Sequence, residues 1–525
     1  MYIHKAAFRL GKERMRVTYS KLKWCASDLV RPNSYSFLAY FLLPVFIAVF
    51  LISLFPDFLP TVFGAYSDQR FFQLGLLLVS AVVALVWAPS IGENQKLLST
   101  SWPVFLVSAA FLLLTIPSSF GEHTWVEPGM YALYFVSFAL MGWRIHEQGL
   151  SQFAAVALVY VATIGCFFYA AMTMTVYFFA IADEFSELTD IIPWGFVNMR
   201  YWSHIATWLL PILPLALMYG SFSKNRLWHI GVSFTAAIWW WMIFMTTARG
   251  SMLSIVLAGF VAFLLYGRAV FPWLMISFRF IVFGGLAWLL FSLAIPSIGA
   301  EEVTVRALKA GSSGRIPLWL EAWCMSLHHF PFGMGAQSWI THQAISEGFP
   351  SSTRLGHPHN MYLMWAAEYG WLLLITLGTL IAITLSNLVT KAGQIRAFAY
   401  KTPEVLIAFT ASAVAGLVHA GFSAVFIVPA SMLVGFLLLT VFWALSLPNG
   451  RPAESPSKQA TPCACGNGLV IFLAVAIVTG GLVWMNQVWR YHEAMVVDLS
   501  QYQERPNAAY WPRFWFHGNF PRPEN

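Results

Sequence analysis

Charged side chains are scarce in this sequence. Lys, Arg, Asp and Glu make up 10% of the 525 residues, against about 25% in a typical soluble protein, which excludes a soluble globular chain. Apolar stretches of roughly 20 residues, the length that a bilayer core requires, recur along the whole sequence, and the mean hydropathy is +0.66. The expected fold class is therefore all-α, a polytopic helical bundle forming one membrane domain.

Cysteine is also scarce, and the five cysteines form no pattern typical of a disulfide framework. Cys463 and Cys465 ("PCACGNG") are expected in a reduced cytoplasmic loop, because two thiols alone make a weak metal site. The net charge of +7 does not imply a nucleic-acid partner, because the basic residues are spread over loops.

Basic residues also predict the orientation. The first 35 residues hold eight Lys and Arg, which predicts a cytoplasmic N-terminal segment (1–35) rather than a cleaved signal peptide. With this end inside, the short inner loops hold ten Lys and Arg and the short outer loops hold three, as the positive-inside rule requires. Thirteen spans are expected, at 36–55, 71–90, 102–118, 129–143, 153–182, 203–222, 230–246, 250–266, 276–296, 361–387, 405–422, 428–446 and 467–487.

This orientation divides the chain. Nine membrane helices occupy residues 36–296, and helices ten to thirteen occupy 361–487. The long segment 297–360 and the tail 488–525 then lie on the outer side, which for a bacterial inner membrane is the periplasm.

Two arginines on the outer side stand where orientation rules disfavour them. Arg200 ("GFVNMRYWSH") and Arg249 ("TTARGSML") lie at helix mouths. They either reach toward lipid headgroups or bind an anion on the outer face. Arg70 ("SDQRFF") is interpreted as an ordinary helix flank.

The outer segment contains a helix expected to lie at the membrane–water interface. Residues 311–314 predict a flexible turn, Ser313 a helix N-cap region, and Pro317 suits a first helical turn. Apolar residues near helical spacing between Ile316 and Phe330 predict an amphipathic helix in contact with membrane lipids. The "PFGMG" stretch is expected to end it.

Arg315 stands at the start of this helix, at the same membrane level as Arg200 and Arg249. Three guanidinium groups gathered at one face repel one another unless an anion neutralises them. Arginine binds phosphate oxygens through a bidentate fork, so a lipid diphosphate is the expected ligand.

The stretch "GHPHNMYLMWAAEYG" (356–370) places histidines at the mouth of a membrane helix. His359 precedes Asn360 and the helix directly, and an imidazole there can take a proton from a hydroxyl at neutral pH. The alternative is a helix-capping or merely interfacial histidine. His357 is the weaker candidate base, because Pro358 is expected to point the two rings in different directions.

Metal binding is not expected, and no cofactor is implied. Carboxylates that could complete a site are few in this segment (Glu321 and Glu347), and His328 and His329 are interpreted as interfacial or structural. The outer segment holds five histidines, namely His328, His329, His342, His357 and His359.

Three stretches in this order resemble the O-antigen ligase superfamily: "TTARGSMLSIVLAGF", "SGRIPLWLEAWCMSLHHFPFGMGAQSW" and "HPHNMYLMWAAEYGW". That group includes lipopolysaccharide O-antigen ligases, O-antigen polymerases and pilin-type O-oligosaccharyltransferases. The resemblance covers roughly residues 190 to 440. Its most specific part is His359 and Asn360 followed by Glu368 and Gly370.

The resemblance implies a metal-independent glycosyltransferase on the periplasmic face, with an undecaprenyl-diphosphate-linked glycan as donor. Arg200 and Arg249 would hold the diphosphate, and His359 would be the base. Arg315 matches the "GR…W" element of the family. The supporting residues are Asn360, His357 and Glu368.

The acceptor separates the members of the superfamily. Lipid A-core is the favoured acceptor, and a pilin, another protein or a growing glycan are the alternatives. The 38-residue outer tail exceeds the usual ligase pattern. A transporter of lipid-linked sugars is the rival outside the enzyme class, with His419 and Arg279 as its in-membrane candidates, although no internal repeat supports it. A channel or structural protein would not explain the grouped arginines.

Overall fold

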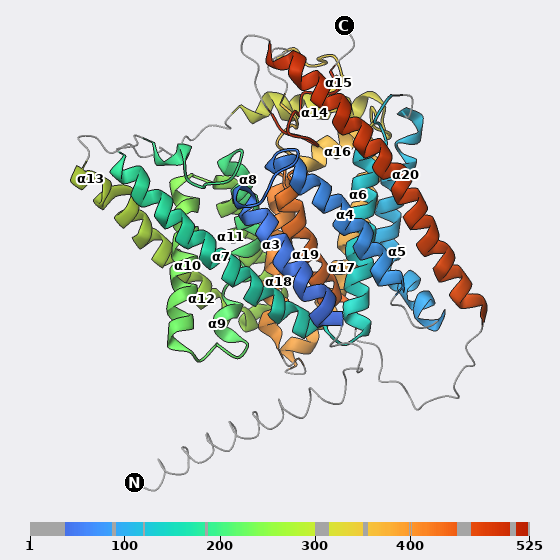
Figure 1. Cartoon of the computed structure of the whole chain (residues 1–525). Coiled ribbons are helices and arrows are strands. Elements are labelled where there is room, and N and C mark those ends of the chain that lie inside the picture. The colour runs from blue at the N-terminus through green and yellow to red at the C-terminus, as the bar shows by residue number, and fades with distance from the viewer. Residues whose placement is uncertain are drawn as a thin grey trace, which may run out of the picture.

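The computed structural model describes residues 37–86, 91–118, 121–183, 187–299, 314–349, 355–397, 400, 402–448, 464–504 and 511–522. Regular structure in these ranges is helical throughout, with no strand among them (Figure 1). Eight helical stretches within them are long and apolar enough to cross a membrane, counting Arg249–Ile298 as one. The expected all-α polytopic membrane bundle is confirmed, while the number of twelve to thirteen spans stays a prediction.

The helices follow one another along the chain with short connections. The first group comprises a π-helical turn (Leu38–Leu42), α3 (Leu43–Leu54), α4 (Ala65–Val86), α5 (Ile91–Leu113), α6 (Val126–Glu147) and α7 (Ser151–Ala182). The second comprises α8 (Met199–Leu209), α9 (Leu215–Met218), α10 (Arg226–Met245), α11 (Arg249–Tyr266), α12 (Phe271–Trp288), a π-helical turn (Leu289–Ala294) and α13 (Pro296–Gly299). The third comprises α14 (Arg315–His328), α15 (Ser338–Thr341), α16 (Met361–Tyr369), α17 (Trp371–Arg396), α18 (Pro403–Ala420), α19 (Pro429–Ser446) and α20 (Ala464–Gln503).

Two expected spans are interrupted, so the prediction of continuous helices there was wrong. The span 203–222 ends at Leu209 and resumes as the short α9, because Pro211 and Pro214 supply no backbone N–H to a helix. The span 361–387 divides at Gly370, whose φ of +86° and ψ of 174° end α16 and begin α17. The last span is longer than expected, because α20 continues to Gln503.

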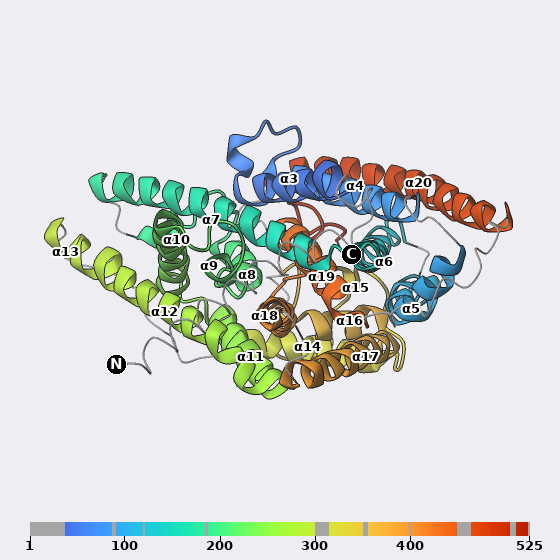
Figure 2. The ribbon, with the colours of Figure 1, turned by 90° about the horizontal axis from the view of Figure 1, so that it is seen from below.

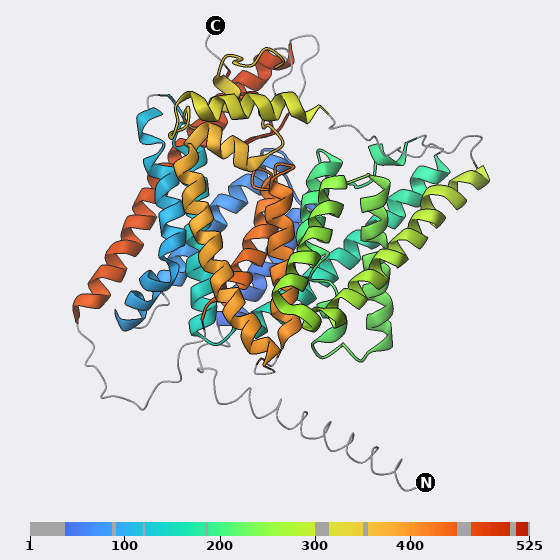
Figure 3. The same cartoon turned by 180° about the vertical axis from the view of Figure 1, so that it is seen from behind.

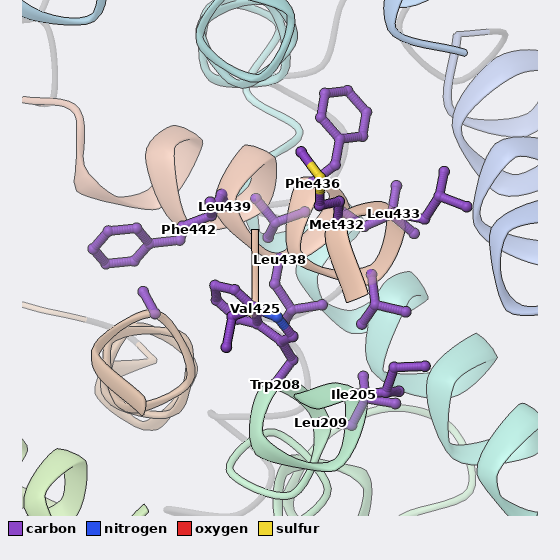
Figure 4. Packing of buried hydrophobic residues seen from close by; sticks show 14 of the residues in the cluster. Ile205, Trp208, Leu209, Val425, Met432, Leu433, Phe436, Leu438, Leu439 and Phe442 are labelled. Atoms are coloured by element: carbon purple, nitrogen blue, oxygen red, sulfur yellow. The ribbon is translucent and has the colours of Figure 1, made fainter. Parts of the chain in front are cut away.

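Helix α19 lies at the centre of the bundle, with α18, α8 and α6 around it (Figure 2). All of its residues are buried. Trp208 of α8 packs closely on small residues of both neighbours: a Cβ added at Gly416 would lie 2.2 Å from its ring, and one at Gly435 would lie 3.0 Å away. Figure 4 shows Trp208 beside Val425 and Leu438 in this core. The close packing fixes α8 against α18 and α19.

One end of the bundle carries the elements between the membrane helices. Helix α14 lies crosswise over this end, above α16 and α17 (Figure 3). We call it the α14 end. Its buried residues Leu318, Ala322 and Met325 pack with Trp339 and Ile340 in a small apolar cluster separate from the main core.

Candidate active site

Helix α14 has the amphipathic form that its sequence predicts. It begins at Arg315 and ends at His328, slightly shorter than the expected 316–330, and it begins after Gly314 while Ser313 lies outside the described residues. Opposite the buried face, four large apolar side chains remain exposed. They are Ile316, Leu320, Trp323 and Leu327. A face of this kind is typical of a helix lying at a membrane interface.

Arg200 and Arg249 stand at the first residues of two helices that are joined to each other. The side chain of Asn198 accepts a hydrogen bond from the backbone N–H of Arg200 (2.8 Å) and thereby caps α8. The hydroxyl of Ser251 in α11 donates to the backbone carbonyl of Ser203 in α8 (3.1 Å). This bond holds the N-termini of the two helices together at one place.

Arg315 completes the group of arginines. It is the first residue of α14, and all three arginines are half-buried. Burial lowers the pKa of Arg315, and the neighbouring charge of Arg249 lowers it further. The expected gathering of Arg200, Arg249 and Arg315 is therefore present, with each at a helix N-terminus, where the helix dipole also favours an anion.

The turn before α16 brings the two histidines into contact. His359 has a left-handed backbone (φ +56°), which is uncommon for a residue with a side chain. Its backbone N–H donates to Nδ1 of His357 (3.1 Å), and the ring centroids lie 4.5 Å apart. The prediction that Pro358 separates the rings was wrong, because the left-handed turn folds one imidazole onto the other. Asn360 accepts from the N–H of Leu363 (3.0 Å) and caps α16.

His359 is unprotonated at neutral pH in this environment. Burial lowers its pKa to about 4, with further contributions from the charges of Arg315 and Arg200. Burial also lowers the pKa of His357 well below its usual value, and His359, Arg513 and Arg315 add to the effect. Two neutral imidazoles therefore lie beside the arginines, and either could accept a proton.

Two further histidines lie beneath this turn. Nε2 of His204 is 2.7 Å from the hydroxyl of Ser423, and Nδ1 of His419 is 2.9 Å from the hydroxyl of Thr207. The two rings lie 5.1 Å apart. His419 lies near Arg315 and Arg200, as expected for a residue at the floor of the site, whereas His204 was not singled out from the sequence although it follows Arg200 by four residues.

Glu368 does not contact the histidines, and its place in the motif has another basis. It is fully buried and pairs with Arg513 of the C-terminal segment at 2.6 Å. Arg513 also pairs with Glu127 of α6 at 2.8 Å. Neither Glu127 nor Arg513 was recognised as part of the site, because no local pattern links residues so far apart in the chain.

Glu321, which could have served a metal, is instead saturated with hydrogen bonds. Its carboxylate accepts from the N–H groups of Ile345 and Ser346 (both 2.7 Å) and lies 2.9 Å from Nε2 of His342. In the part of the chain that the structure describes, no three His, Cys, Asp or Glu side chains gather as metal ligands. His328 and His329 are exposed at the end of α14.

An apolar cavity of about 270 Å³ extends from this region into the bundle. Tyr362 and Trp365, just after the histidine turn, line one part, and Leu265 and Leu388, at the far ends of α11 and α17, line another. The lining is almost entirely aliphatic and aromatic. Its length and chemistry suit a hydrocarbon chain.

Comparison with known families agrees with the motifs. Residues 234–378 match the family described as O-Antigen ligase, which supports membership of the O-antigen ligase superfamily and confirms the resemblance. The match is narrower than the stretch from 190 to 440: it includes Arg249, Arg315 and His359, while Arg200 lies outside it. Members of the family are glycosyltransferase-like membrane enzymes. No curated protein matches the chain.

Proposed function

We propose that this protein transfers a preassembled glycan from undecaprenyl diphosphate to an acceptor hydroxyl on the periplasmic face of a bacterial inner membrane. The observation that carries the proposal is the gathering of Arg200, Arg249 and Arg315 around an unprotonated His359. Lipid A-core is the favoured acceptor, which makes the protein an O-antigen ligase. The reaction needs no metal in this proposal, because the arginines provide the positive charge.

The proposed chemistry is a direct displacement. The acceptor oxygen attacks the anomeric carbon of the glycan, and its proton passes to a ring nitrogen of His359. The bond between the anomeric carbon and the diphosphate oxygen breaks, and its electron pair leaves with undecaprenyl diphosphate. A single displacement inverts the anomeric centre, and His359 afterwards releases its proton to solvent.

The arginines have two roles in this proposal. They stabilise the charge that grows on the departing diphosphate, and they keep His359 unprotonated before the donor binds. A bound diphosphate offsets the charges of Arg315 and Arg200, which lower the pKa of His359. His359 therefore becomes a stronger base when the donor is in place.

The apolar cavity supports a lipid-linked donor. Tyr362 and Trp365 line it only three and six residues after His359. A polyprenyl chain in the cavity would place its diphosphate near the N-termini of α8, α11 and α14. This arrangement suits a substrate that is half hydrocarbon and half polar.

The test is glycan transfer in detergent or proteoliposomes, with purified chain and a defined lipid-linked donor. Lipid A-core, a pilin or other protein, and a short glycan are offered as acceptors in parallel. The proposal expects a new glycoside and an equal amount of released undecaprenyl diphosphate. Transfer to protein or to glycan would reassign the chain to the oligosaccharyltransferases or polymerases.

The transporter alternative predicts a different outcome in the same experiment. A transporter would move the lipid-linked glycan across the vesicle membrane and leave its glycosyl–phosphate bond intact. Transport without bond cleavage would therefore contradict the proposed function.

A further inference from the structure

The C-terminal segment 511–522 enters the bundle at the α14 end. Figure 1 shows it in dark red beside α16. Arg513, Phe514 and Trp515 are each at most 2% exposed, although the segment follows the long helix α20. A tail that served only as a surface appendage would not bury an arginine and two aromatic rings.

Arg513 joins two carboxylates from different helices. Its Nε and one terminal nitrogen donate to the two oxygens of Glu127 in α6 (2.9 and 2.8 Å). The same terminal nitrogen lies 2.6 and 2.8 Å from the oxygens of Glu368 in α16. All three side chains are buried, so the charges are strongly coupled and the planar guanidinium sets their geometry.

The same residue reaches the histidine turn. The remaining terminal nitrogen of Arg513 is 3.3 Å from the carbonyl of Gly356. Gly356 packs so closely on the segment that an added Cβ would lie 3.1 Å from the Cβ of Arg513. Gly356 precedes His359 by three residues, and Glu368 ends the helix that His359 introduces. Arg513 thus contacts both sides of the turn.

The segment also contacts the helix that carries an arginine of the proposed clamp. The carbonyl of Pro512 accepts from the hydroxyl of Tyr201 (3.5 Å), the residue after Arg200. The other side of the segment is held by α4: Tyr66 donates to the carbonyl of Arg513 (2.6 Å), and Arg70 donates to that of Phe514 (3.0 Å).

We propose that Arg513 is a positioning residue for the proton acceptor, holding the turn of Gly356 to Asn360 in place through Gly356 and Glu368. The C-terminal segment is then a built-in part of the active site. This inference rests on the proposed function, because the acceptor is His359. Arg513 itself touches neither substrate nor reacting atoms, and its loss acts on the rate of the chemical step rather than on donor binding.

The test compares Arg513→Lys with Arg522→Lys. Lysine keeps a positive charge between the two carboxylates but loses the planar fork. Arg522 lies in the same segment and pairs with Asp498, away from the turn, so its replacement is the matched control. Measured quantities are kcat, the KM for the lipid-linked donor, and hydrogen exchange of backbone amides in 355–370.

For Arg513→Lys we expect kcat to fall about 10²-fold, as for a misplacement of roughly 1 Å in a catalytic group. The donor KM stays within about threefold, and amides in 355–370 exchange faster. Arg522→Lys leaves all three unchanged. Wild-type kcat, or unchanged exchange in 355–370, would overturn the proposal.

A second variant separates positioning from simple charge neutralisation. The triple change Glu127→Gln, Glu368→Gln and Arg513→Gln removes all three charges and leaves no buried carboxylate without a cation. A triple variant with wild-type kcat would show that Arg513 only neutralises charge, which overturns positioning. Should the wild-type chain transfer no glycan at all, the proposed function fails, and the exchange measurement alone still decides whether Arg513 orders the turn.

Discussion

The backbone N–H of His359 donates to Nδ1 of His357 at 3.1 Å. Nδ1 of His357 is therefore an acceptor, so a neutral His357 carries its proton on Nε2. His357 fixes the left-handed turn, and this contact leaves the ring of His359 for the substrate. The two histidines have different roles although only one residue separates them.

His359→Ala should abolish glycan transfer while the protein still inserts and accumulates. A general base contributes about 10²–10⁴-fold to the rate, and no other neutral imidazole is placed to substitute without moving the turn. The measurement is in vitro transfer from a purified lipid-linked donor. His328→Ala is the control, because His328 is exposed at the end of α14, and its rate should stay near that of the wild type. Near-normal turnover in His359→Ala would reject the assignment of the base.

Arg200→Lys and Arg249→Lys should each lose roughly 10- to 100-fold in rate, because an ammonium group cannot form the bidentate fork. Losing one charged hydrogen bond costs about 1.5–3 kcal/mol. Arg279→Lys is the control, since Arg279 is exposed on α12 and bonds to Ser233. Wild-type rates in both site variants would favour an interaction with lipid headgroups instead of a diphosphate clamp.

The sequence predicted the helices and the gathered arginines because both depend on local patterns. Asn198 and Asn360 are polar residues directly before helices, and hydropathy places the helices in a membrane. Arg70 shows the limit: it was interpreted as a helix flank and is instead completely buried, donating to a carbonyl 444 residues away. Such a contact depends on the packed bundle, and no local pattern in the chain marks it.

The motif around Glu368 was recognised, but its physical basis was not visible in the sequence. Glu368 serves Arg513 instead of the substrate. The contact between the imidazoles was also missed, because proline between two residues does not predict a left-handed turn at the second. What the sequence leaves open is thus tertiary: which distant side chain completes each polar group.

The pH dependence of kcat/KM should report the pKa of His359 in the free enzyme. That pKa is about 4, so activity should be independent of this group near neutral pH and fall only in acid. Arg315 disfavours the imidazolium, and Arg315→Gln should therefore raise the pKa and move the acid limb to higher pH. The pH profile of each protein gives the midpoint even where the overall rate is reduced. An acid limb that stays in place would show that Arg315 does not act on the base.

Gly370→Ala should destabilise the fold. Gly370 has φ +86° and ψ 174°, a region that costs other residues about 1–3 kcal/mol. An added Cβ would also lie 2.4 Å from the carbonyl oxygen of Pro331, whose hydrogen bond to the N–H of Trp371 (2.9 Å) fastens "PFGMG" to the start of α17. The measurement is the melting temperature of the purified protein in detergent. Gly378→Ala in α17 is the control, because a Cβ there meets no atom within 4 Å. Equal melting temperatures for the two variants would contradict this account.

Transfer should survive treatment with EDTA, and added Mg²⁺ or Mn²⁺ should change the rate little. Mg²⁺ prefers carboxylate and phosphate oxygens in octahedral arrays. Glu321 is occupied by His342, Ile345 and Ser346, and Glu368 is occupied by Arg513, so neither carboxylate is available to build such an array. If EDTA abolished transfer and Mg²⁺ restored it, the arginine clamp would be the wrong mechanism. If EDTA has no effect while Arg249→Lys loses most of its activity, the charge that stabilises the departing diphosphate belongs to the protein itself.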